Sequence, residues 1–174
     1  MSEIESIDLK TDRLRLRELG PEDAPFMLAL LNDEAFVRNI ADRGVRTIEQ
    51  ARQYIIDGAM ASYQKHGFGL WGVVPHDQAS CVGICGLIRR ETLDDVDIGY
   101  AFLPEWRGQG YALEAAQACM DLGRERFGLR RILAITSMDN PASARLLEKI
   151  GLRFERLIRF SEDAEQLRLF AWSA

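Results

Sequence analysis

The sequence predicts an α/β (α+β) fold built on a mixed sheet of seven strands with helices on both faces. Three features of the chain support this class: predicted strands and helices alternate, several early strands follow one another through short turns, and one strand-helix-strand unit stands in the middle. Short turns make antiparallel pairs, whereas the strand-helix-strand unit makes one parallel pair with a right-handed crossover. The 174 residues, 47% of them hydrophobic, suffice for one sizeable core, so we expect a single domain over residues 1–174.

Hydrophobic periodicity and turn residues give the order of the elements. The clearest helix start is the capping box of Thr47 and Gln50, and Gly67 is placed to end that helix. Asn140 and Pro141 form an N-cap and first-turn pair for the last helix. The predicted elements are strands at about 13–17, 68–74, 81–90, 97–103, 131–136, 154–160 and 167–171, helices at about 23–32, 47–67, 111–127 and 140–150, and a polar connection at 33–46.

The stretch 97–115 runs from an apolar strand through a turn with two glycines into a helix. The first N–H groups of a helix have no partner within it, and the helix dipole adds partial positive charge there, so such a turn attracts phosphate. Gly108 and Gly110 have no Cβ, which lets a pyrophosphate approach the main chain, and Arg107 adds a permanent charge. The stretch lacks the third glycine of a dinucleotide fingerprint and the Gly-Lys-Ser/Thr of a P-loop.

Composition excludes several other classes of protein. The formal net charge is −5 and there is no basic tail, which argues against a nucleic-acid partner. The two histidines and three cysteines have no metal-ligand spacing, so we expect no metal and reduced thiols. No apolar run approaches the roughly 20 residues of a membrane span, and the acidic start at residues 1–5 is unlike a signal peptide. We therefore expect a cytoplasmic protein without membrane contact, and a homodimer stays open.

The string Arg107-x-x-Gly110-x-Ala112 resembles the Arg/Gln-x-x-Gly-x-Gly/Ala signature of the GNAT acetyltransferases. Residues 11–17 and 140–151 resemble strings of the branch that contains the ribosomal-protein N-terminal acetyltransferases of the Rim type. The predicted order of elements is also similar to that of the GNAT fold. This resemblance implies acetyl-CoA as the acetyl donor, with its pantetheine arm lying like an extra strand where the two central parallel strands splay apart.

The resemblance also implies which residues contact the cofactor. Main-chain groups of Phe102 and Leu103 would bind the pantetheine arm, and their N–H groups would donate to the thioester oxygen. On the last helix, Asn140 and Ser143 would face the pantetheine and the thioester, although Asn140 is also an ordinary helix cap. The pyrophosphate would be held by the loop residues Arg107, Gly108, Gln109, Gly110, Tyr111 and Ala112.

Catalysis needs a base for the amine and a proton for the departing thiolate. Asp97 is the first candidate base, because many family members place a glutamate on this central strand, and Glu105 is a weaker second. Leu147 stands where many relatives have a tyrosine acid, and no tyrosine follows Tyr111. The sequence therefore leaves Ser143 or a water to protonate the sulfur.

We expect direct acetyl transfer to a primary amine, most simply the N-terminal α-amine of a protein or peptide. Neutralising an α-amine at pH 7 costs roughly 1 to 1.4 kcal/mol, against roughly 4.6 kcal/mol for a lysine side chain. No cysteine lies where its pKa would be lowered, so we expect no acyl-enzyme. Two alternatives stay open: a small acceptor such as a polyamine, amino acid derivative or aminoglycoside, and a CoA-binding regulatory module without turnover. The acidic residues at 33–46 and in the final hairpin turn would suit a cationic amine, but solvation is the better explanation for them.

Overall fold

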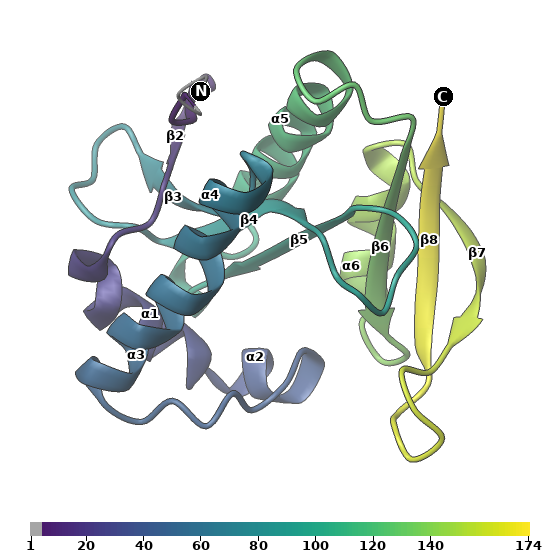
Figure 1. The fold of residues 1–174 in the computed structure, drawn as a ribbon, viewed down its shortest axis with the longest axis horizontal. Coiled ribbons are helices and arrows are strands. Elements are labelled where there is room, and N and C mark those ends of the chain that lie inside the picture. Colours follow the sequence, from purple (N-terminus) through teal and green to yellow (C-terminus); the bar gives the residue numbers. More distant parts are fainter. Residues whose placement is uncertain (1–4) are drawn as a thin grey trace.

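The computed structural model describes residues 5–174, which form one eight-stranded mixed sheet with helices on both faces (Figure 1). The strand order is β1-β2-β3-β4-β5-β6-β8-β7. Neighbouring strands pair antiparallel except β5 and β6, which are parallel. The predicted class and the single parallel pair are confirmed, whereas the predicted number of seven strands was wrong. Residues 1–4, most of the acidic start, lie outside the described part.

The elements have the following bounds. The strands are β1 Asp8–Lys10, β2 Leu14–Arg17, β3 Leu70–Pro75, β4 Gly83–Ile88, β5 Asp97–Phe102, β6 Arg131–Ser137, β7 Arg153–Ile158 and β8 Leu167–Ser173. The α-helices are α1 Ala24–Leu31, α2 Glu34–Asn39, α3 Ile48–Ile55, α4 Ala61–His66, α5 Tyr111–Glu125 and α6 Pro141–Lys149. Short 3-10 turns lie at η1 Pro21–Asp23 and η3 Pro104–Trp106, and the π-helical turn η2 Ile56–Met60 joins α3 to α4.

Two elements were absent from the sequence prediction. Strand β1 has only three residues and is too short for a periodic pattern; it pairs with β2, where Arg15 binds Asp8 through two hydrogen bonds of 2.8 and 2.9 Å. Helix α2 lies within the stretch expected to be a polar connection. The Asp33 carboxylate caps this helix by accepting from the Phe36 N–H at 3.1 Å, and the Phe36 side chain is buried. One cap and one buried aromatic therefore anchor a helix that composition alone does not reveal.

The predicted caps are confirmed at the named positions. The Thr47 hydroxyl accepts from the Gln50 N–H at 3.1 Å, and the Gln50 side chain accepts from the Thr47 N–H at 3.2 Å. Gly67 ends α4 in the left-handed region with φ 79°. The Asn140 side chain caps α6 by accepting from the Ser143 N–H at 3.2 Å. The last turn of helix 111–127 differs, because α5 ends at Glu125.

Two layers of helices cover the sheet on opposite faces. Buried residues of α1 and α3 pack with Ile84 of β4 and Ala101 of β5 on one face. Buried residues of α5 and α6 pack with Ile98 and Phe102 of β5 on the other. Side chains of a strand point to the two faces alternately. Strand β5 therefore presents even-numbered residues to the α5–α6 face and odd-numbered residues, Asp97 included, to the α1–α3 face.

Candidate active site

The parallel strands β5 and β6 diverge soon after they meet. In the described part of the chain their register holds one pair, Asp97 with Leu133, supported by the Leu133 N–H donating to the Val96 carbonyl at 2.9 Å. A cavity of about 800 Å³ lies at this divergence and is lined by residues of both sheet faces. This volume is within the range of small-molecule and cofactor sites, roughly 300 to 1,000 Å³.

The main-chain groups of β5 differ in whether they face this gap. The Leu103 N–H donates to the Val82 carbonyl at 3.0 Å, so it is directed toward β4. Because main-chain groups alternate in direction along a strand, those of Tyr100 and Phe102 face the gap. The Phe102 carbonyl accepts from Arg107 Nε at 3.0 Å, which leaves its N–H for a ligand. Of the two predicted main-chain donors, Phe102 is directed at the gap and Leu103 is not.

The loop between η3 and α5 has an open backbone with two glycines in the left-handed region. Gly108 and Gly110 adopt left-handed conformations with φ 73° and 82°, which other residues rarely adopt. A Cβ at Gly108 would meet nothing within 4 Å, so the main chain is open there. Helix α5 starts at Tyr111 without a side-chain cap, and its first N–H groups are not covered by a capping residue. Gly108, Gly110, Tyr111 and Ala112 all line the cavity.

Arg13 of the N-terminal segment braces this loop, a role that the sequence did not reveal. Its Nη1 donates to the Gln109 carbonyl at 2.8 Å, its Nε pairs with Glu114 at 2.8 Å, and its guanidinium lies 4.4 Å from the centre of the Tyr111 ring. The Gln109 side chain donates to the Glu105 carbonyl at 2.9 Å, so it also stabilises the loop itself. The resemblance at residues 11–17 was the available signal, but nothing in the spacing pairs Arg13 with a loop so distant in the chain.

Arg107 lines the cavity, but the protein's own groups engage its guanidinium. It forms an ion pair with Asp33, the cap of α2, and donates to the Phe102 carbonyl. Helix α2 supplies Phe36 and Asn39 to the lining, and Phe36 packs with residues of α1 and α3. Arg107 therefore joins the loop before α5 to the cap of α2.

The hydroxyls of Tyr100 and Ser143 meet on the α5–α6 face of the gap, 2.6 Å apart. Tyr100 comes from β5 and Ser143 from the first turn of α6, which Asn140 caps. Burial raises the pKa of Tyr100 to about 12, so its hydroxyl carries a proton at neutral pH. The sequence reasoning missed Tyr100 because it sought an acid after Tyr111 on the last helix. The strand alternation that directs Tyr100 to the cofactor face was the signal that could have found it.

Asp97 lies on the other face, is 1% exposed and lines the cavity. Burial raises the pKa of its carboxyl to about 6, although Arg90 lowers it by donating Nε to both carboxylate oxygens at 3.0 and 3.2 Å. The carboxylate is therefore mostly ionised at pH 7 and can accept a proton. Glu105, the weaker candidate base, is exposed on η3 and is not among the lining residues.

The cavity is positively charged although the chain is acidic. Five basic residues and one acidic residue, Asp97, line it, in a protein with formal net charge −5. The basic residues are Arg43, Arg90, Arg107, Arg145 and Lys149. Within residues 5–174 no group of three metal-ligating side chains is found, and no helix is long and apolar enough to span a membrane. The lining thus suits an anionic organic cofactor.

The fold is that of an acyltransferase. The chain belongs to the GNAT acetyltransferase family, because the model of the acetyltransferase (GNAT) domain matches residues 13–153. It is 32% identical over 152 residues to the protein named uncharacterized N-acetyltransferase YoaA of Bacillus subtilis, covering 87% of this chain and 85% of YoaA. The predicted family is confirmed.

Solved structures of GNAT enzymes share the fold. An acetyltransferase of the GNAT family from Bacillus anthracis is 26% identical, with a TM-score of 0.80 over 96% of this chain and 98% of that chain. The structure titled RimL, ribosomal L7/L12 alpha-N-protein acetyltransferase in complex with coenzyme A, is 20% identical, with a TM-score of 0.81 over 97% of this chain and 98% of RimL. At 20% identity this second likeness concerns the fold alone.

Proposed function

We propose that this GNAT N-acetyltransferase uses acetyl-CoA and transfers acetyl directly to the N-terminal α-amine of a protein or peptide. The observation that carries the proposal is the gap between β5 and β6, where a proton donor and a proton acceptor lie on opposite faces. Tyr100 and Ser143 share a hydrogen bond on one face, and the Asp97 carboxylate lies on the other. Bound acetyl-CoA would supply an activated acetyl thioester at this gap.

The residues present fit the diphosphate and pantetheine of this cofactor. The open loop at Gly108 and the uncapped start of α5 direct main-chain N–H groups at an anion. Arg145 and Lys149 of α6 add positive charge along the same cavity, and Arg107 can exchange Asp33 for a phosphate. In our proposal the contacts predicted for Gln109, Ala112 and Asn140 are retained. The main-chain contact predicted for Leu103 is dropped, because its N–H donates to the Val82 carbonyl and its own carbonyl accepts from the Trp106 N–H, both at 3.0 Å.

Each side chain at the gap has one proton role. Asp97 accepts the amine proton, directly or through a water, and Arg90 holds its carboxylate in place. Tyr100 delivers its hydroxyl proton to the departing thiolate, while Ser143 orients that hydroxyl at 2.6 Å. The Phe102 N–H donates to the oxygen on which negative charge develops. No cysteine takes part: Cys119 is fully buried, and a hydrogen bond with Cys85 and burial raise its pKa.

An α-amine is the acceptor that this base serves best. A carboxylate with a pKa of about 6 is weak, and an α-amine needs only roughly 1 to 1.4 kcal/mol to become neutral at pH 7. RimL, whose fold the chain shares, is described as acting on a protein α-amine, which supports this choice. The acidic residues at 33–46 and in the final hairpin turn do not support a cationic acceptor, because Asp97 is the one acid among the residues that line the cavity. A cytoplasmic location and a homodimer stay predictions.

Two measurements test the proposal. Acetyl-CoA should raise the melting temperature, because it binds the folded state and not the unfolded chain. Release of the CoA thiol should then be measured against peptides that begin with Ser, Ala or Thr and against polyamines, amino acids and aminoglycosides. Turnover of small amines alone would replace the peptide acceptor by the second candidate. Stabilisation by acetyl-CoA without turnover of any acceptor would favour the regulatory module.

A further inference from the structure

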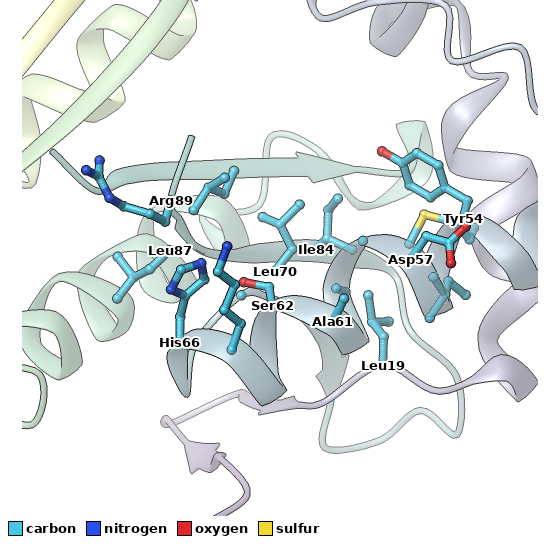
Figure 2. A pocket seen from close by; sticks show the side chains of 17 residues that line it. Leu19, Tyr54, Asp57, Ala61, Ser62, His66, Leu70, Ile84, Leu87 and Arg89 are labelled. Atoms are coloured by element: carbon cyan, nitrogen blue, oxygen red, sulfur yellow. The ribbon is translucent and has the colours of Figure 1, made fainter. Parts of the chain in front are cut away.

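A second cavity of about 310 Å³ lies between the helical segment α3–η2–α4 and the neighbouring strands β3 and β4 (Figure 2). Its volume is at the lower end of the range of small-molecule sites. The π-helical turn η2 contributes Asp57, Gly58 and Ala59 to its wall. Such turns are rare and are found frequently at functional sites, so this interruption of the helix favours a functional role for the pocket beneath it.

This pocket adjoins the main cavity on the α1–α3 face of the sheet. The residues that line both are Tyr54, Leu70, Ile84 and Ile88. In the sheet register, Ile88 lies opposite Asp97 and Ile84 lies opposite Ala101, so the shared wall is level with the part of β5 that borders the gap. Strands are about 4.8 Å apart, which places the pocket above β3 roughly 10 Å from β5. The pocket and Asp97 therefore lie on the same face of the sheet, about two strands apart, with this shared wall between them.

The pocket has an apolar interior and unequal charge at its two ends. Leu70 and Ile84 lie along its middle. Leu87, His66 and Arg89 lie at one end, and Tyr54 and Asp57 lie at the other (Figure 2). Two cationic residues, Lys65 and Arg89, and the imidazole of His66 line it against one acid. That acid, Asp57, already accepts a hydrogen bond from Gln53 at 2.8 Å. The end with Lys65, His66 and Arg89 has no acidic residue among those that line the pocket.

The contacts of Arg89 and His66 favour an anionic ligand at the basic end of the pocket. Arg89 Nη1 donates to the Leu93 carbonyl at 2.9 Å, which fixes the guanidinium and leaves its other N–H groups for a ligand. The His66 ring stacks on Phe68 with 5.4 Å between ring centres. Burial and the positive charges of Lys65 and Arg89 lower the pKa of His66, and no acid counters them. A carboxylate at this end would offset that repulsion.

We propose that this pocket holds the apolar, carboxylate-terminated end of a short acceptor, such as the free C-terminus of a peptide of about three residues. An extended chain spans about 3.3 to 3.6 Å per residue, so three residues cover the roughly 10 Å between β5 and the pocket. Lys65 binds the carboxylate, Arg89 adds positive charge at the same end, and the side chains of the peptide lie against Leu70 and Ile84. The inference rests on the acetyl transfer proposed above and narrows its acceptor from proteins to short peptides.

The test compares the tripeptide Ala-Leu-Leu with its C-terminal amide as acceptors for the full-length protein. Wild type should acetylate the free acid with a kcat/KM about tenfold higher, as expected for one charge-assisted contact. Lys65→Gln should reduce this preference several-fold. The matched control Gln64→Glu changes the net charge equally at the next exposed position of α4, which does not line the pocket, and should keep the preference. Ala61→Phe, which fills the pocket from an exposed helix position, should lower kcat/KM for both peptides.

Calorimetric titration of the same two peptides, with CoA present and absent, separates this inference from the proposed function. Equal binding and equal turnover of acid and amide would overturn the pocket assignment, whatever the outcome with acetyl-CoA. An unchanged preference in Lys65→Gln, with circular dichroism showing an intact fold, would do the same. Failure of acetyl-CoA to stabilise the protein would instead overturn the proposed function, while a tenfold binding preference for the free acid would still support the pocket.

Discussion

Replacing Tyr100 by Phe removes the hydroxyl that we assign as the proton donor and changes little else. General acids contribute about 10² to 10⁴ in rate. A thiol with a pKa near 8.5 is a fair leaving group, so we expect the lower end, a kcat about 100-fold lower, or about 2.7 kcal/mol. Losing the 2.6 Å hydrogen bond to Ser143 should cost about 1 kcal/mol of folding free energy and lower the melting temperature by about 2 to 4 °C.

Thiol release under saturating acetyl-CoA measures this effect, and an acetyl thioester of a more acidic aryl thiol supplies the control. That thiolate needs no proton to depart, so the deficit of Tyr100→Phe should largely disappear with it. Ser143→Ala keeps the phenol and removes its hydrogen-bond partner, and we expect a smaller loss than for Tyr100→Phe. A kcat within about threefold of wild type for Tyr100→Phe, or an equal deficit with both thioesters, would refute the role of Tyr100 as acid.

Three further predictions follow from the site. For Asp97→Asn we expect a large loss of kcat/KM, and the ratio of wild type to variant should rise about tenfold from pH 5 to 7 and then level off, because the base is active only when deprotonated and its pKa is about 6; a pH-independent ratio would contradict this. Arg107→Ala should raise the KM for acetyl-CoA about tenfold with a smaller change in kcat, since one charge-assisted contact is lost; an unchanged KM in steady-state assays would remove Arg107 from the phosphate site. Cys119→Ala should retain turnover, because this buried thiol takes no part in transfer, and a folded but inactive variant would point to an acyl-enzyme.

The parts of the fold that the sequence predicted are those with local causes. The Thr47 capping box, the left-handed Gly67 and the Asn140 cap each involve neighbours in the chain, and each was found where expected. Helix α2 and strand β1 depend on contacts that sequence spacing does not record. Asp33 caps α2, but Phe36 becomes an anchor only because α1, α3 and the sheet bury it.

The candidate site shows the same division. The glycines of the phosphate loop were predictable, because their φ values of 73° and 82° follow from a tight turn into a helix. The partner of Ser143 was not, because Tyr100 is on another element 43 residues away. The engagement of Arg107 by Asp33 was equally hidden, as these residues are 74 positions apart and meet only when α2 forms. A motif therefore located the loop but did not reveal which side chains the fold brings to it.

The proposed acid and base lie on opposite faces of the sheet because side chains alternate along a strand. Asp97 and Tyr100 are three residues apart on β5, and an odd spacing places their side chains on opposite faces of the sheet. An amine that meets Asp97 therefore approaches from the α1–α3 face, while a thiol that leaves beside Tyr100 does so on the α5–α6 face. The two substrates can meet only where the sheet is open, and β5 and β6 are paired at Asp97 and not at Tyr100. The N–H groups of Tyr100 and Phe102 face this opening, and buried main-chain N–H groups require partners. In this account a pantetheine arm lying along β5 provides them, so the same break in the sheet both creates the passage for the acetyl group and binds the molecule that carries it.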